Sequence, residues 1–232
     1  MKTITSIGFL ILFPITLSGQ NLKEIKLSAD IPANEQIPNE YQFVFPTFMQ
    51  GTIAFPNSAP SRAKFNYNFL FDEIQYINAK GEKMTMANPE EMISAVINKR
   101  VFIYRNKGFY EVIETGKISL LLKRHCFLYM ENKPVGYGMT SSTSAVNSAS
   151  YITSEGSREY KLTESGVYTI KLDSSYWISD GRKIFNALTL KNYKKLFSKN
   201  ETEIDSFFKA NQINMKQEAD LRRLVDYCNS LK

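Results

Sequence analysis

The sequence predicts a mainly β (α+β) fold, in which an antiparallel sandwich or a partly open barrel carries two to three C-terminal helices packed on it. Between residues 41 and 180, short apolar or alternating runs are separated by turn residues at intervals of about eight to twelve positions. After residue 183 the apolar spacing becomes helical. Hydrophobic residues make up 43% of the chain and aromatic residues 13%, which is enough for a packed core and excludes a disordered chain.

The N-terminus has the pattern of a secretory signal peptide. Lys2 precedes an apolar run from Ile4 to Leu17, and the small residues Ser18 and Gly19 follow it. The run contains Pro14 and is shorter than the roughly 20 residues that a membrane-spanning helix needs. We therefore expect residues 1–20 to be removed and the protein to be exported, to the periplasm or the extracellular side.

Two kinds of membrane attachment are not expected after signal removal. The residue that follows Gly19 is Gln20 and not the cysteine that a lipoprotein signal requires, so the sequence predicts no lipid anchor. No later stretch is long and apolar enough for a transmembrane segment. Residues 21–40 are polar and contain Pro32 and Pro38, which predicts an extended N-terminal segment before the β domain.

The β domain is expected at residues 41–180. Alternating and apolar runs predict strands at 49–55, 63–69, 73–77, 83–86, 101–104, 109–113, 118–130, 160–162 and 167–178. Turn residues between neighbouring strands predict β-hairpins at 73–86 and 101–113. Residues 138–156 are rich in Ser and Thr and are expected to form a long loop, with Tyr137 at its beginning.

The C-terminal segment, 183–232, is expected to be helical and to pack on the β domain. Helical spacing is found at 193–197 and 204–208, and the clearest helix is expected to start after a cap at Asn214. Its apolar stripe consists of Leu221, Leu224, Val225, Cys228 and Leu231. This stripe is the predicted docking face.

Charge and composition exclude several classes of function. The formal net charge is +6, but the lysines are scattered, and the basic strip at Lys191, Lys194 and Lys195 is typical of the solvated side of a helix. We therefore expect no nucleic-acid partner. A single histidine, His125, and two distant cysteines cannot form a zinc or copper site, and no glycine-rich phosphate loop is present, so no cofactor is predicted.

Few residues are candidates for chemistry or recognition. Cys126 and Cys228 permit a disulfide in an exported protein, although each also suits an apolar core. Asn66 and Asn68 alternate with aromatic residues on one strand, so their amides either satisfy neighbouring backbone or face a polar ligand. Glu111, among aromatic residues, is the candidate for one member of a pair of glycosidase carboxylates. Tyr137 is a further recognition candidate.

Several segments together resemble a group of uncharacterised exported proteins of Bacteroidota. The resemblance is carried by Gly51-Thr52-Ile53-Ala54-Phe55, Phe65-Asn66-Tyr67-Asn68, Ile74-Gln75-Tyr76-Ile77, Phe109-Tyr110-Glu111-Val112-Ile113, Gly136-Tyr137-Gly138 and the ending around Tyr227-Cys228-Asn229. It covers most of the chain after the signal. It implies residence in the periplasm or beyond the outer membrane, and it implies no activity.

Three functions remain open from the sequence. The first is a non-enzymatic envelope protein that binds another protein or a surface component, because exposed loops on a rigid β scaffold commonly carry recognition. The second is a carrier that holds a small apolar ligand within the β domain. The third is a glycan hydrolase that uses paired carboxylates.

Overall fold

The computed structural model describes residues 22–130, 133–135, 139–141, 144–145, 150–154, 157–162 and 165–231. The strands of its main sheet are β1 (Leu22–Leu27), β2 (Met49–Ala54), β3 (Ser61–Asn68), β4 (Glu73–Ile77), β5 (Lys83–Thr85), β6 (Ser94–Ile97), β7 (Arg100–Arg105), β8 (Gly108–Glu114), β9 (Ser119–Met130), β12 (Ser144–Ala145), β15 (Gly166–Ser179) and β16 (Ile184–Asn186). Two small hairpins are formed by β10 (Lys133–Val135) with β11 (Met139–Ser141), and by β13 (Ser150–Ser154) with β14 (Ser157–Lys161).

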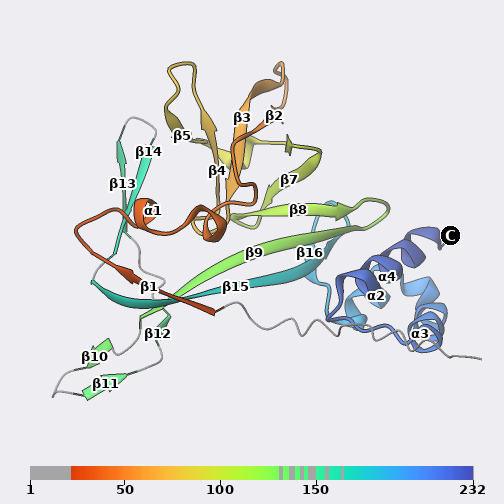
Figure 1. The fold of residues 1–232 in the computed structure, drawn as a ribbon. Coiled ribbons are helices and arrows are strands. Elements are labelled where there is room, and N and C mark those ends of the chain that lie inside the picture. The colour runs from red at the N-terminus through yellow and green to blue at the C-terminus, as the bar shows by residue number, and fades with distance from the viewer. Residues whose placement is uncertain are drawn as a thin grey trace, which may run out of the picture.

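The main sheet is antiparallel and confirms the predicted fold class. Its strands follow the order β1-β15-β9-β8-β7-β6-β2-β3-β4-β5, with β12 beside β9 and β16 beside β15. The sheet is not closed into a barrel. In Figure 1 the long strands β9 and β15 run side by side across the molecule, β2 to β7 curve above them, and the C-terminal helices gather at one end.

Three apolar clusters form the core. The first lies on the inner face of β2 to β8 and is built around the aromatic residues Phe45, Phe65, Tyr67, Phe102 and Phe109. A second cluster joins one end of β9 and β15 to the C-terminal helices. The third packs Leu128 and Ile170, from the other end of the same two strands, against the N-terminal segment. The long strand pair therefore connects the three clusters.

The C-terminal helices are α2 (Leu190–Leu196), α3 (Glu201–Ala210) and α4 (Glu218–Ser230). The predicted stripe on the last helix is confirmed, because Leu221, Leu224, Val225 and Cys228 are buried against the sheet. The predicted cap was wrong: α4 begins at Glu218 with Gln217 before it, and the Asn214 backbone N–H donates to the Asp220 carboxylate at 3.0 Å. Among the described residues, no helix is long and apolar enough to cross a membrane.

Within the predicted N-terminal segment 21–40, residues 22–27 form a strand of the main sheet. Strand β1 pairs along its whole length with β15, and a short helix α1 (Ala33–Gln36) follows. Prolines in this segment indicated irregular structure, while the strand itself carries lysines and a glutamate that are typical of a protected sheet edge. Strand β6 also has no counterpart in the sequence-based prediction. It is followed by a two-residue turn in which Asn98 and Lys99 both have positive φ.

Part of the predicted long loop at 138–156 is strand. Within the described residues, β11, β12 and β13 fall in this range, and β13 pairs with β14. Ser and Thr are compatible with strand as well as loop, so composition alone did not separate the two states.

Candidate functional site

An open apolar pocket of about 360 Å³ lies on the inner face of the curved part of the sheet. Its walls are formed by Ile53, Phe55, Ala63, Phe65, Tyr76 and Met86, with Ser61, Arg62 and Ala87 at its margin. The volume lies in the range of about 300–1,000 Å³ that is typical of small-molecule sites, and such sites are mostly apolar.

Strand pairing explains why these apolar side chains converge. Ile53 on β2 lies opposite Ser61, Phe65 on β3 lies opposite Tyr76 on β4, and partners across an antiparallel pair project to the same face. Ala63 has a short side chain, so the wall recedes there. A Cβ atom at Gly51 would lie 2.9 Å from the Phe65 ring, so the glycine allows that ring to lie close against β2.

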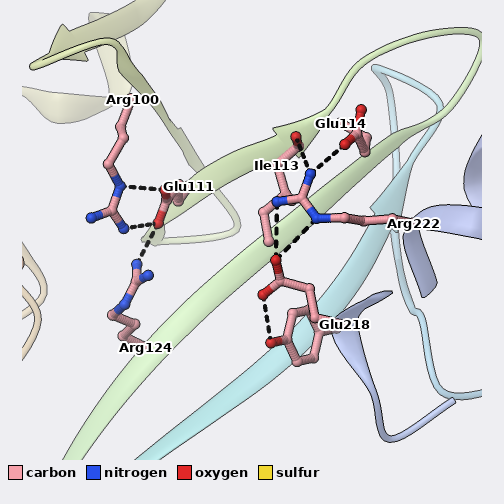
Figure 2. Close-up of polar contacts among 8 residues, drawn as sticks. Arg100, Glu111, Ile113, Glu114, Arg124, Glu218 and Arg222 are labelled. Atoms are coloured by element: carbon pink, nitrogen blue, oxygen red, sulfur yellow. Dashed lines mark hydrogen bonds and ion pairs between the residues drawn. The ribbon is translucent and has the colours of Figure 1, made fainter. Parts of the chain in front are cut away.

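The strongest ionic cluster is centred on Glu111, whose side chain is only 11% exposed. Arg100 donates from Nε and Nη2 to the two carboxylate oxygens, and Arg124 donates from Nη1 to one of them, as Figure 2 shows. Burial alone raises the pKa of Glu111, but the hydrogen bonds from the two guanidinium groups outweigh it and lower the pKa below its ordinary value.

This geometry does not favour Glu111 as a glycosidase carboxylate. A general acid needs a raised pKa, and the nucleophile or base of the pair needs a carboxylate oxygen that is free to face the substrate. Both oxygens of Glu111 accept hydrogen bonds from arginines, and its pKa is lowered. The cluster instead joins β7, β8 and β9 across the sheet.

A second cluster connects helix α4 to the sheet. Arg222 donates to the Ile113 carbonyl at 3.1 Å, to the Glu114 carboxylate and to Glu218 at 3.0 Å (Figure 2). The Tyr176 hydroxyl donates to Glu218 at 2.9 Å. Because these contacts join three elements, they fix the orientation of the helix on β8 and β15.

The Asn66 amide and the side-chain oxygen of Asn68 satisfy backbone groups, whereas Asn68 Nδ2 is buried without a hydrogen-bond partner among the described residues. Asn66 accepts from the Phe45 N–H at 3.2 Å and donates to the Phe45 carbonyl at 2.8 Å, while Asn68 Oδ1 accepts from Leu70 and Phe71 at 3.1 Å. Both asparagines are buried. Of the two interpretations left open by the sequence, the geometry favours the structural one over the display of amides to a ligand.

His125 takes part in a hydrogen-bond chain across β9 and β15. Trp177 Nε1 donates to Ser175 Oγ at 3.0 Å, and Ser175 Oγ lies 2.9 Å from His125 Nε2. Indole can only donate, so the serine proton is available to a neutral histidine. Burial, followed by the nearby Lys123, lowers the pKa of His125 and favours this neutral form.

The possible disulfide between Cys126 and Cys228 is not formed, because both cysteines are free. Cys126 packs against the first and third apolar clusters, whereas Cys228 is buried in the second cluster beneath the helices. Desolvation raises the pKa of each thiol to about 12. Their apolar character, which the sequence also indicated, places them in separate parts of the core.

Tyr137, the remaining recognition candidate, lies outside the described residues. Sequence reasoning did not identify the apolar pocket, because its walls come from strands whose pairing is not visible in one sequence. The alternation of Ile53 and Phe55, and of Ala63 and Phe65, was the available signal. In the part of the chain that is described, no group of three or more His, Cys, Asp or Glu residues is placed to hold a metal ion.

Compared with known proteins, the chain matches no protein-family model, no curated protein and no solved structure.

Proposed function

We propose that the protein is an exported, non-enzymatic binding protein that holds a small apolar ligand in the pocket between β2, β3 and β4. The observation that carries the proposal is the apolar pocket itself, with its open mouth and its aromatic walls at Phe55, Phe65 and Tyr76. Export is supported by the apolar N-terminal run after Lys2.

The driving force for such binding is the transfer of apolar surface out of water. Each buried methylene contributes about 0.8 kcal/mol, so a chain of several methylenes offsets the translational and rotational cost of association. Phe55 and Tyr76 are half-buried and Ile53, Phe65 and Met86 are buried, so the walls are already held in place before a ligand enters. A preformed wall reduces the ordering cost of binding.

The other two functions are weaker proposals. An envelope protein or surface component as partner remains compatible with export and with the scattered positive charge, but no described surface favours it as specifically as the pocket favours a small ligand. A hydrolase that uses Glu111 has to break the ion pairs of that carboxylate with two arginines. Breaking them costs free energy, because it leaves a largely buried charge without a partner.

Native mass spectrometry of the gently purified protein separates these proposals. A retained small mass that is released by organic solvent supports the ligand-binding function. A stoichiometric additional protein supports the partner-binding function instead. If the protein carries no additional mass and also takes up none of a panel of added aliphatic alcohols, the ligand-binding proposal is wrong.

A further inference from the structure

A second depression lies on the opposite face of the same strands, and Arg62 lines both. The outer depression has a volume of about 360 Å³ and is lined by Gln50, Gly51, Thr52, Arg62, Val96, Asn98 and Lys99. No acidic residue lines either depression among the described residues. The inner, apolar pocket and the outer, polar depression therefore share one cationic residue.

Strand geometry places Arg62 at the boundary between the two. It pairs with Thr52, which in turn pairs with Val96, so all three belong to the outer face. Its neighbours Ser61 and Ala63 belong to the inner face, because successive side chains alternate along a strand. Arg62 is the second residue of β3, near the end of the β2–β3 hairpin, and it lines both depressions. Its side chain is long and flexible enough to bring the guanidinium group to a ligand head group at the pocket margin.

Arg62 also has unused binding capacity. It is exposed, and within the described part of the chain no ion pair or hydrogen bond involves its guanidinium group. Lys64 and Lys99, both exposed, have no ion pair to a described residue either. Guanidinium binds carboxylate and phosphate oxygens through two parallel hydrogen bonds, so an anionic group is the ligand chemistry that this residue fits.

We propose that the ligand is a single-chain amphiphile with an anionic head group. Its apolar chain lies in the pocket, and its carboxylate or phosphate binds Arg62 at the margin. This inference rests on the proposed ligand-binding function and adds the charge of the head group. An uncharged or cationic head group gains nothing from Arg62.

The test compares four ligands that share a dodecyl chain: dodecanoate, dodecyl phosphate, dodecanol and dodecyltrimethylammonium. Isothermal titration of the purified protein, below the critical micelle concentrations, gives an affinity for each. We expect the anionic ligands to bind about two- to fivefold more tightly than dodecanol, as is typical of one exposed ion pair. The preference should decrease at high salt, because exposed charges are screened.

Two variants test whether Arg62 is responsible for the preference for anionic ligands. Arg62→Gln should bind dodecanoate and dodecanol equally and should keep the wild-type affinity for dodecanol. Arg182→Gln, at an exposed arginine in the turn between β15 and β16, is the matched control and should retain the preference. A preference for only one of the two anionic ligands supports the inference and identifies the head group as carboxylate or phosphate.

The possible failures are distinguishable. If dodecanol and both anionic ligands bind the wild-type protein equally, the anionic head group is wrong and the apolar pocket stands. If the preference persists in Arg62→Gln, Arg62 is not the head-group partner and the inference is wrong. If none of the four ligands binds, the proposed ligand-binding function itself is wrong.

Discussion

Arg100 contacts both carboxylate oxygens of Glu111 across the neighbouring strands β7 and β8. The guanidinium group also lies 5.1 Å from the centre of the Phe45 ring. One arginine therefore joins an ion pair to the aromatic core, and the planar fork of guanidinium suits both contacts.

Replacing Glu111 by Gln should lower the free energy of unfolding by about 2 kcal/mol, because charge-assisted hydrogen bonds are replaced by weaker ones. Two half-buried guanidinium groups then lose their carboxylate partner. Urea unfolding measures the change, and Glu24→Gln, at an exposed position of β1, serves as the control with little expected effect. An unchanged midpoint for Glu111→Gln would contradict the structural role of the cluster.

The effect of Glu111 on stability should depend on pH. Its pKa is lowered in the folded protein from an ordinary value of 4.5, because the hydrogen bonds from arginine outweigh burial. The stability from this group is therefore present above pH 4.5 and is lost as the pH falls through the folded pKa. In urea titrations from pH 7 to pH 3, the difference between wild type and Glu111→Gln should narrow at the acidic end. A difference that is constant over this range is the contrary result.

Buried Tyr193 and half-buried Tyr176 should respond oppositely to the loss of their hydroxyl groups. The Tyr193 hydroxyl is buried without a hydrogen-bond partner among the described residues, so Tyr193→Phe should raise the free energy of unfolding by about 1 kcal/mol. The Tyr176 hydroxyl donates to Glu218, so Tyr176→Phe should lower it by about 1 kcal/mol. Thermal or urea unfolding of the two variants measures both changes. Equal decreases in the free energy of unfolding for both variants would show that the Tyr193 hydroxyl has a hydrogen-bond partner.

The thiols of Cys126 and Cys228 should be reduced but protected from alkylation in the native protein. Cys228 is fully buried, and burial raises the pKa of both cysteines to about 12, so iodoacetamide should modify the native protein very slowly. In denaturant without reductant, both thiols should react, and mass spectrometry counts the added groups. Labelling that requires a reductant would mean that a disulfide forms after all.

The sequence predicted the fold well where a single strand or helix carries its own signal. Two strands were predicted from the alternation of apolar residues at 49–55 and 73–77, and α4 was predicted from its apolar stripe. The period of the side chains alone distinguishes a strand from a helix in these segments. Strands β1 and β6 were missed, since one is charged at a sheet edge and the other depends on a turn of Asn98 and Lys99 without glycine. A glycine in that turn would have been the usual hairpin signal.

The candidate site was less predictable than the fold. Its apolar residues were visible in the sequence, but the pocket depends on Phe65 lying opposite Tyr76 and on the Phe65 ring lying close to Gly51. Register and cross-strand distance are tertiary properties that one sequence does not contain. Glu111 was recognised as unusual among aromatic residues, yet its arginine partners lie on two other strands and were not foreseen.

The central claim is that the apolar pocket binds a ligand, and a pocket-filling variant tests it most directly. N-phenyl-1-naphthylamine, an uncharged apolar dye, should fluoresce strongly with the wild-type protein and weakly with Ala63→Trp, whose indole occupies the pocket. Lys64→Trp places the same side chain on the outer face of the same strand and should leave dye binding unchanged. Equal dye binding by wild type and a folded Ala63→Trp variant would contradict the claim.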